Sequence, residues 1–466
     1  MRVRIFSIVT LLAILSALLP GRVQAWQLIV PLTGHRHRSI DPRTLFHTLL
    51  DDFYVQPDGT TYVQTGDIPA MWLRDSAAQT IPYIGFAPYY QSIALRIHGA
   101  IAREALDINT DPYANAFQAN FHIWERKWEI DSLAWPVLLA WTYEREMRDR
   151  SIYTASLHHA FSLIVKTYAC EQHHATCSTY RYPYHVWTHE AYNPSTGMIW
   201  SAFRPSDDPV VYRYNIPQNA LAVIALDEIA ELAREGWHDK ALSDRALTLA
   251  REVYVGIRRY GIALDPRTHK TIYAYEVDGL GHAKLMDDAN LPSLLALPYI
   301  GWCASDDPRY VRTRNFVLSS GNPYYYSGIY AAGIGSPHTP YDRVWPLAII
   351  ARALTSTSAP EVSEAISELA QTDGNDGLIH ESFYVDGWWQ YTRADFGWAN
   401  ALYAELLFRT IATFRQPAML PFGTMTQFEG ESETPTLVPT LVRFENSGTL
   451  FGALGAAIAE RRTSAQ

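Results

Sequence analysis

The chain has little cysteine, few charged residues and no run of lysine or arginine. Only 3 of its 466 residues are cysteines, and charged residues make up 18%. The 48 acidic residues outnumber the 38 basic ones, which argues against a phosphate backbone as a partner, so we expect no nucleic-acid binding. The 26 glycines and 27 prolines are near average usage, and 48% of the residues are hydrophobic. Collagen-like, low-complexity and intrinsically disordered classes are therefore excluded.

Several familiar site motifs are also missing. The sequence contains neither a phosphate-binding loop nor the glycine fingerprint of dinucleotide-binding folds. It lacks the Gly-x-Ser-x-Gly nucleophile elbow, and His185 and His189 have the spacing of a zinc helix without its glutamate. Phosphotransfer, hydride transfer, and serine or zinc hydrolysis therefore have no support in the sequence.

The N-terminus has the three parts of a secretory signal. Two arginines lie within the first four residues, an apolar run extends from Ile5 to Leu19, and Val23-Gln24-Ala25 offers small residues for cleavage. We therefore expect residues 1–25 to be removed and the protein to be periplasmic or secreted. No second run of about 18 apolar residues follows, so we expect no membrane span in the mature chain.

The three cysteines are Cys170, Cys177 and Cys303. In an oxidising compartment Cys170 and Cys177 can form a local disulfide, which leaves Cys303 unpaired. Because His173 and His174 lie between them, the same segment also has the ligand types of a zinc site, and unpaired thiols are the third alternative.

Apolar residues recur at helical spacing along most of the chain. Leu221, Ile224, Ile229 and Leu232 form one stripe, with Asp227, Glu228 and Glu231 off it; Val362, Ile366 and Leu369 form another. Ser132 is expected to cap a helix from Leu133 to Trp141. Further helices are expected around Phe46, Ile93, Phe161, Leu247, Leu295, Leu347 and Leu402, and short strands at residues 271–276 and 440–444.

About a dozen helices with long polar and aromatic loops suit an all-α toroid, in which inner and outer helices alternate and the loops at one end form a pocket. No linker is evident between Asp41 and Phe414. After residue 416 the composition shifts to proline, threonine and glutamate. We therefore expect a catalytic domain over residues 26–416 and an extension over 417–466 that packs on it or is partly mobile.

Carboxylates cluster in four of these loops, each beside Arg, His or Asn side chains that can set their ionisation. Carboxylates on separate loops are what glycoside hydrolysis requires: one protonates the leaving oxygen, and the other activates water or attacks the sugar. Each can also be structural, as a helix cap or a turn residue. The loops contain Trp72, Arg74 and Asp75; Arg204, Asp207 and Asp208; Asp287, Asp288 and Asn290; and His380 and Glu381.

At these loops the sequence closely resembles glycoside hydrolase family 125, the metal-independent exo-α-mannosidases. The matching strings follow one another in the expected order, and together they cover roughly residues 41–414. They lie at residues 66–79 (GDIPAMWLRDSAAQ), 111–139, 197–217 (including FRPSDD), 273–301 (including MDDANLPSLLALPYIG), 315–340 (including GIGSPHTP) and 380–406 (including HESF).

The resemblance implies an (α/α)6 barrel that removes non-reducing terminal α-1,6-linked mannose from manno-oligosaccharides or N-glycans. It implies inversion by single displacement, with no metal or other cofactor. The family's general acid maps onto Asp208, with Asp207 as the alternative, and its general base onto Glu381. Inversion requires the two carboxyl groups to lie about 6.5–9.5 Å apart. Substrate contacts are expected from Trp72, Arg74, Asp75, Arg204, Asp207, Asn290, Tyr325, His338 and His380.

Two regions depart from the family pattern: the stretch Trp388-Trp389-Gln390 and the tail after residue 416. The first can alter the subsite for the leaving sugar, so linkage preference follows less directly than reaction type. Two alternatives remain open, namely a glycosidase of the same fold for another sugar or linkage, such as a glucosidase, and a non-catalytic exported glycan-binding protein.

Overall fold

The computed structural model describes residues 42–184 and 191–412. The signal segment, the expected strand at 440–444, the extension 417–466, and His185 and His189 lie outside the described residues. Within the described part, no helix is long and apolar enough to cross a membrane.

Helices dominate the described chain. The α-helices are α2 (Pro42–Asp51), α3 (Leu73–Thr80), α4 (Gln91–Thr110), α5 (Ile130–Met147), α6 (Ala155–Gln172), α7 (His174–Cys177), α8 (Ile216–Leu232), α9 (Lys240–Tyr260), α10 (Pro308–Val317), α11 (Pro346–Leu354), α12 (Ala359–Gln371) and α13 (Gly397–Ala412). Shorter helical segments are η1 (Ile81–Phe86), η2 (Arg150–Ile152) and η3 (Ala233–Trp237).

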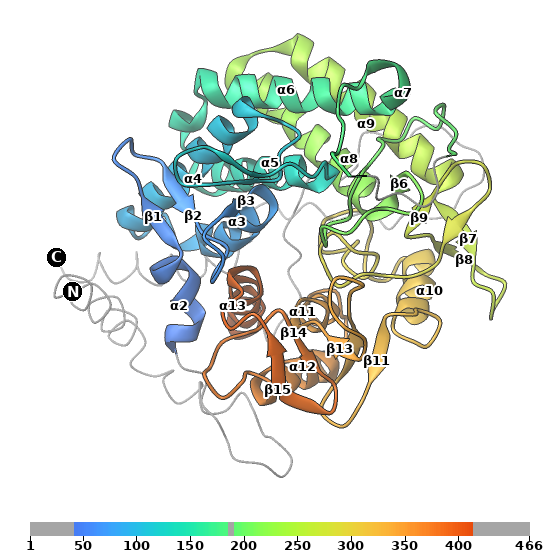
Figure 1. Ribbon diagram of the computed structural model, residues 1–466. Helices are drawn as coiled ribbons and strands as arrows, with labels where there is room; N and C mark the ends of the chain where they lie inside the picture. The colour runs from blue at the N-terminus through green and yellow to red at the C-terminus, as the bar shows by residue number, and fades with distance from the viewer. Residues whose placement is uncertain (1–41, 185–190, 413–466) are drawn as a thin grey trace.

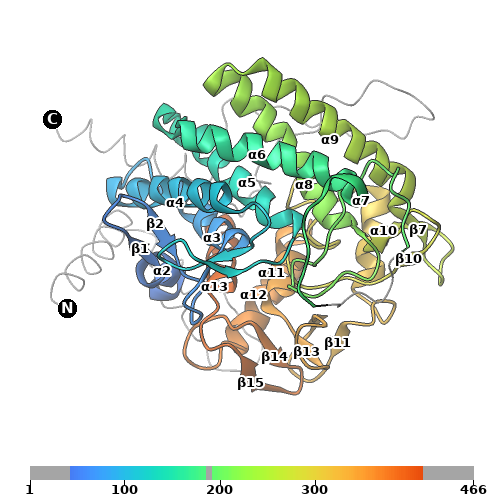
Figure 2. The ribbon, with the colours of Figure 1, turned by 45° about the horizontal axis from the view of Figure 1, so that its top comes forward.

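The α3, α5, α8, α11 and α13 helices surround the centre of the molecule (Figure 1). Contacts run from α11 to α13, α3, α5 and α8 in that order. Figure 2 shows α4, α6 and α9 in a second layer outside α3, α5 and α8. Burial follows this arrangement, since every residue of α8 except Asp227 and Glu231 is buried, whereas α9 buries one face. Glu228, expected off the apolar stripe, is buried as well.

The helix expected around Leu295 is not formed, and that prediction was wrong. Residues 291–302 instead make successive turns, although Leu294, Leu295 and Leu297 are buried as a core helix would be. The Asp287 carboxylate accepts hydrogen bonds from the backbone N–H groups of Leu294 and Leu295, at 2.8 and 2.9 Å. A buried apolar run therefore has its backbone satisfied by a side chain here, rather than by helical hydrogen bonds.

The start of α5 also differs from the expectation. The helix begins at Ile130, and Ser132 lies inside its first turn. The Ser132 hydroxyl donates to Glu129 Oε2 at 2.8 Å instead of capping the helix. The helix over Val362, Ile366 and Leu369 is confirmed as α12, with Ile366 and Leu369 buried.

Short strands cover one end of the helices (Figure 1), and two predicted site residues, Trp72 and Tyr325, lie within them. The expected strand at 271–276 is split between two pairings, in β8 and β9. The strands are β1 (Phe53–Val55), β2 (Thr61–Val63), β3 (Met71–Trp72), β4 (Ala116–Phe117), β5 (Ile123–Glu125), β6 (Tyr214–Asn215), β7 (Ile262–Leu264), β8 (Thr271–Tyr273), β9 (Glu276–Val277), β10 (Ala283–Lys284), β11 (Tyr325–Ser327), β12 (Ala332–Ile334), β13 (Arg343–Val344), β14 (Ser382–Tyr384) and β15 (Gly387–Thr392).

These strands form small antiparallel sheets, ordered β1-β2, β3-β4-β5, β10-β9-β6, β7-β8, β11-β12 and β13-β14-β15. In the third of these, Tyr214 pairs with Val277, and in the last, Val344 pairs with Phe383. Such pairings hold loops from distant parts of the chain against one another at one end of the helices.

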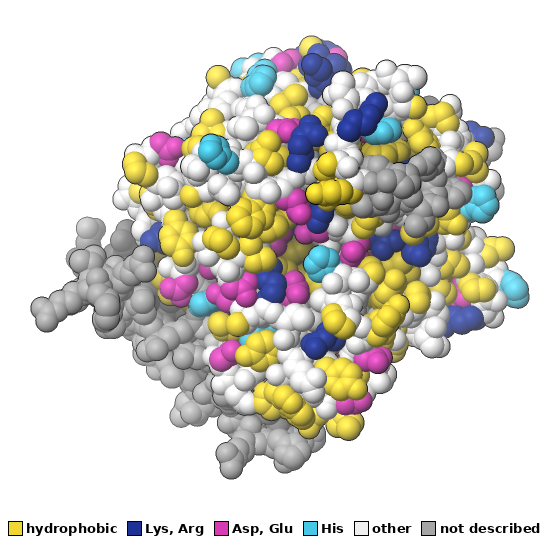
Figure 3. Space-filling view, viewed as in Figure 1, with side chains coloured by type: hydrophobic (Ala, Val, Ile, Leu, Met, Phe, Trp, Pro, Cys, Tyr) yellow, Lys and Arg dark blue, Asp and Glu magenta, His cyan; other side chains and the backbone are white. Residues whose placement is uncertain are grey.

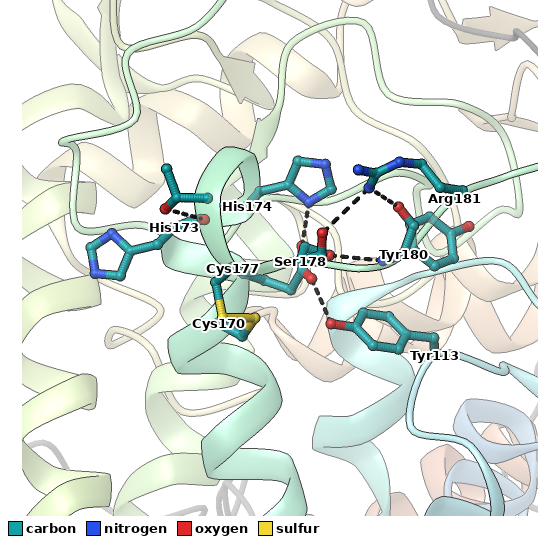
Figure 4. Close-up of a disulfide and its surroundings, with 10 residues drawn as sticks. Tyr113, Cys170, His173, His174, Cys177, Ser178, Tyr180 and Arg181 are labelled. Carbon is teal, nitrogen blue, oxygen red and sulfur yellow. Dashed lines mark hydrogen bonds and ion pairs between the residues drawn. A yellow bond between two sulfur atoms is a disulfide. The ribbon is translucent and has the colours of Figure 1, made fainter.

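Of the three alternatives for Cys170 and Cys177, the structure shows the disulfide, which joins the end of α6 to α7 (Figure 4). Cys303 is free and half-buried. His174 pairs with the buried Glu171 at 2.7 Å and stacks on Trp200, so its ring is engaged in packing. Across residues 42–184 and 191–412, no group of three or more His, Cys, Asp or Glu side chains is placed to hold a metal ion.

Candidate active site

Charged and histidine side chains gather around a hollow near the centre of the face that bears the short strands (Figure 3). Arg74 and Asp75 reach this region from the first turn of α3, directly after β3. Both are buried, at 3% and 4% exposure. Burial of a charge is stable only where other charges and hydrogen bonds compensate it.

Arg74 is surrounded by carboxylates from three segments. Its Nη1 donates to Glu129 Oε2 at 2.8 Å and to Asp131 Oδ2 at 3.1 Å, both at the start of α5. Its Nη2 lies 3.6 Å from Asp207 Oδ1, and its Nε lies 3.4 Å from Asp75 Oδ2. The guanidinium therefore holds the four carboxyl groups together. We call Arg74 and these four carboxyl groups the floor of the site. Sequence reasoning included Glu129 and Asp131 only within a matching string and did not identify them as site residues.

Four carboxyl groups around one guanidinium cannot all stay ionised. Burial, reinforced by the charge of Asp207, raises the pKa of Glu129 well above its ordinary value. Burial alone would raise the pKa of Asp207, but the hydrogen bond from Glu129 and the charges of Arg74 and Lys127 lower it to about 2. Glu129 therefore holds the proton that it shares with Asp207, and Asp207 remains a carboxylate.

Burial likewise raises the pKa of Asp75 and of Asp131 to about 6, with Arg74 opposing the shift in each case. Asp75 Oδ2 is buried and has no hydrogen-bond partner among the described residues. The indole Nε1 of Trp72, which is 8% exposed, is in the same situation. Because buried polar atoms are nearly always paired, these two are candidates for contacts with sugar hydroxyls.

Asp207 and Asp208 are adjacent but have different surroundings. Asp207 adopts a left-handed φ of 64°, which Asp tolerates better than most residues. Its N–H donates to the Arg204 carbonyl, and the Arg204 N–H donates to the Asp208 carbonyl, so the turn is tight. The Asp207 side chain joins the Arg74 cluster, whereas Asp208 Oδ2 lies 3.5 Å from His338 Nδ1.

His338 interacts with both predicted catalytic carboxyl groups. Its pairing with Asp208, with added attraction from Asp207 and Glu381, raises the pKa of His338 to about 9. The imidazole is therefore a cation at neutral pH. Two loops far apart in sequence, at 208 and 381, thus face the same positive group.

Glu381 directly precedes β14 and is 8% exposed. Burial raises the pKa of this carboxyl, while the charges of Arg393 and His338 oppose the shift. Arg393 also bonds Asp67 Oδ1 at 2.8 Å, which ties the loop after β15 to the loop before β3. Gly66, at φ 56°, allows this approach, because a Cβ there would collide with the Asp395 carbonyl.

His380 is enclosed by other protein groups. It is 1% exposed, stacks on Tyr391 at 3.6 Å between ring centroids, and its Nδ1 lies 3.2 and 3.1 Å from the carbonyl oxygens of Arg393 and Ala394. The ring is packed among protein groups, and the expected substrate contact of His380 stays a prediction. In this geometry His380 holds the segment that positions Glu381.

Arg204 and Asn290 also lie behind the exposed groups. Arg204 Nε donates to the buried Glu276 at 2.6 Å. Asn290 Nδ2 donates to Asp288 Oδ1 at 3.2 Å, and Asp288 Oδ2 accepts from Ser206 at 2.7 Å. Both side chains therefore support the loop that carries Asp207 and Asp208.

Tyr325 is half-buried and pairs with Ile334 in the β11–β12 hairpin. Its neighbour Tyr324 lies close enough to Arg204, Asp288 and Asp208 for their charges to act on its hydroxyl. Tyr324, in the turn before β11, is therefore a better candidate for this part of the site than Tyr325. Sequence reasoning had no signal to choose among three consecutive tyrosines.

Comparisons with known proteins agree with this picture. The family described as metal-independent α-mannosidase (GH125) matches residues 41–408. The meiotically up-regulated gene 157 protein of Schizosaccharomyces pombe is 36% identical over 401 residues, which is 77% of this chain and 78% of the yeast protein.

A solved structure from Streptococcus pneumoniae is 38% identical, with a TM-score of 0.76, over 78% of this chain and 92% of that one. It is described as a non-productive complex with α-1,6-mannobiose, from a family of metal-independent α-mannosidases. A bacterial glucoamylase bound to acarbose is 14% identical, with a TM-score of 0.52, over 72% of this chain and 48% of that one, and shares the fold alone.

The match over most of the chain, the similarity to the pneumococcal enzyme and the paired carboxyl loops lead to one conclusion: the chain belongs to glycoside hydrolase family 125, the metal-independent α-mannosidases.

Proposed function

We propose that this α-mannosidase is an inverting exo-enzyme that removes non-reducing terminal α-1,6-linked mannose from manno-oligosaccharides or N-glycans. The observation that carries the proposal is the placement of Asp208 and Glu381 on separate loops, with both carboxyl groups acting on His338. The α-1,6-mannobiose bound by the pneumococcal relative supports the linkage.

The proposal includes a closed (α/α)6 barrel. The contacts from α11 through α13, α3 and α5 to α8 supply five inner helices, and the turned segment 291–302 takes the place of the sixth. Hydrogen bonds on both sides of that segment support this view. Tyr299 donates to Glu405 of α13 at 2.9 Å, and Tyr310 of α10 donates to the Leu295 carbonyl at 2.8 Å.

In the proposed reaction, Asp208 gives its proton to the glycosidic oxygen as the bond from that oxygen to C1 breaks. Glu381 takes a proton from a water molecule whose oxygen attacks C1 from the opposite face. The products are β-mannose and a glycan one residue shorter, with Asp208 left ionised and Glu381 protonated. Proton exchange with solvent then restores both groups.

The two adjacent aspartates are assigned on their surroundings. An acid catalyst must hold a proton near the working pH. The pKa of Asp207, about 2 because Glu129, Arg74 and Lys127 outweigh its burial, does not suit that role. Asp208 lies outside the Arg74 cluster and remains 27% exposed at its side chain, where a leaving group can reach it.

The terminal sugar is assigned to the floor formed around Arg74. Asp75 and Trp72 each offer a buried polar atom that lacks a hydrogen-bond partner among the described residues, and such atoms discriminate strongly for hydroxyl groups at matching positions. Because the groups around the floor are buried, a chain could not continue past it, which favours an exo mode. His338, next to Asp208, remains a proposed substrate neighbour.

Proton NMR of the purified protein with α-1,6-, α-1,2- and α-1,3-mannobiose tests the proposal. We expect β-mannose to form first, and from the 1,6 isomer. Early α-mannose would overturn the single-displacement roles of the two carboxyl groups. Asp208→Asn and Glu381→Gln should each lower kcat at least about a hundredfold, the scale of lost acid–base catalysis. Asp207→Asn should instead raise KM, because Asp207 belongs to the floor and is not the proposed acid.

We also propose that the enzyme is exported. The N-terminal signal pattern supports this, and so does the Cys170–Cys177 disulfide, because such bonds persist mainly in oxidising compartments. Fractionation of cells that produce the full chain, with N-terminal sequencing of the exported product, tests it. A cytosolic product that retains residues 1–25 would refute it.

A further inference from the structure

Four large apolar side chains are exposed on loops that adjoin the candidate site in sequence, and we call them the rim patch. They lie on two loops and one hairpin, and between 41% and 79% of each residue is exposed: Ile329, Tyr330, Tyr341 and Trp389. Hydrophobic side chains gather over the β14–β15 hairpin, on the same face as the hollow (Figure 3). Exposed aromatic residues that adjoin a site are more often functional than exposed aliphatic residues scattered singly.

The hairpin is built to present Trp389. Phe383 pairs with Tyr391, but the next residue, Tyr384, pairs with Gly387. Residues 388–390 therefore leave the ladder as a bulge, and bulges of this kind re-aim side chains next to active sites. Arg343 of β13 donates to the Gln390 carbonyl at 2.5 Å and holds the bulge in place.

A second loop braces the first. The Tyr330 N–H donates to the Val385 carbonyl at 3.0 Å, and the Ile329 N–H donates to Asp386 Oδ1 at 2.7 Å. The rings of Tyr330 and Trp389 meet edge to face, with centroids 6.2 Å apart. The two rings thus form a fixed surface whose conformation needs no further ordering when a ligand binds.

Two residues of the rim patch lie within three residues of groups that contact the proposed catalytic carboxyl groups. Trp389 lies three residues before Thr392, whose side chain hydrogen-bonds Glu381. Three extended residues span about 10 Å. Tyr341 follows by three residues His338, the partner of Asp208. Tyr324 is close enough to both Asp208 and Tyr341 to interact with each, and so bridges the acid and the rim.

We propose that the rim patch binds the part of the glycan beyond the sugar to which the cleaved mannose is linked. The preferred substrate is then a chain longer than a disaccharide. The inference rests on the proposed mannosidase function. Flat rings pack against the C–H faces of sugars, and a neutral surface suits a neutral glycan. The position next to both catalytic loops places such a chain on the leaving-group side, where the released product is held.

The test compares kcat/KM for α-1,6-mannobiose and for linear α-1,6-mannotetraose. We expect wild type to prefer the tetraose. Trp389→Ala and Tyr341→Ala should each lower kcat/KM for the tetraose about five- to tenfold, mainly through KM, and leave the biose unchanged within twofold. Trp389→Phe, which keeps a ring, should retain most of the preference. Trp124→Ala removes a comparably exposed tryptophan from β5 and is the matched control.

Each other result overturns the inference in a recognisable way. Equal kcat/KM for the two substrates in wild type, or tetraose rates unaffected in both alanine variants, would refute the rim patch and leave the mannosidase intact. A loss with Trp124→Ala and not with Trp389→Ala would move the binding surface to β5. If wild type cleaves neither substrate, the proposed linkage fails, and the rim patch fails with it.

Discussion

At the scale of single residues, the site depends on how a few buried carboxyl groups share charge. Arg74 is almost fully enclosed, yet its contacts with Glu129 and Asp131 compensate its burial. The proton on Glu129 allows Asp207 to stay ionised within hydrogen-bond reach of it. This arrangement gives Asp207 and Asp208 different surroundings, although the two are the same residue type at adjacent positions.

His338 provides a pH test at the same scale. Pairing with Asp208 raises the pKa of His338 from 6.5 to about 9 in the folded protein. The folded state therefore binds this proton more tightly than the unfolded state, and the stabilisation is complete below about pH 6.5. It is lost as the pH rises from 6.5 through 9. Relative to His338→Gln, the wild-type advantage in unfolding free energy should shrink over that range.

Urea unfolding of both proteins at pH 6 and pH 9.5 measures this difference. The carboxyl groups that act on the imidazole are those of Asp208, Asp207 and Glu381. A difference between the proteins that is the same at both pH values would show that His338 is not protonated by this pairing.

At the scale of elements, the apolar periodicity of the sequence predicted a helix correctly where one face of the helix packs in the core, as in α12. It failed around Leu295, because the apolar run is buried but its backbone is satisfied by Asp287 rather than by a helix. The start of α5 was misplaced for a related reason. Ser132 matches a cap in composition, but its hydroxyl bonds the Glu129 side chain inside the first turn.

The disulfide offers a test of element stability. It closes a loop of sequence separation 7 between α6 and α7. Loop-closure entropy for so short a ring predicts that the double variant Cys170→Ala/Cys177→Ala loses about 2 kcal/mol of unfolding free energy. Thermal and urea unfolding with and without reductant measure the loss. Reductant should destabilise wild type and leave the double variant unchanged; an effect of equal size in both would assign the change to something other than this bond.

At the scale of the whole molecule, loops from the entire described chain converge on one end of the helices. Asp67 meets Arg393, Arg74 meets Asp131 and Asp207, and Asp208 meets His338. The family match covers residues 41–408, which is nearly the same part of the chain as the described residues 42–184 and 191–412.

Metal independence is a whole-molecule prediction. The carboxylates of the site are engaged by Arg74, Lys127 and His338, so their negative charge is already compensated. Dialysis against EDTA should leave kcat/KM for α-1,6-mannobiose within twofold of the untreated enzyme. A loss of activity that added Ca²⁺ or Zn²⁺ restores would contradict this prediction.

The sequence by itself determined the family, most of the helices and the loops that carry the chemistry, because long strings and apolar periodicity are local properties of the chain. Tertiary structure alone decided that Asp207 belongs to the Arg74 cluster and Asp208 faces His338. Their difference comes from the left-handed backbone at Asp207 and from partners 50 or more residues away. It also decided that Glu129 and Asp131 contact Arg74 and that His380 packs on Tyr391, since the ionisation and direction of a side chain depend on neighbours that only folding brings together.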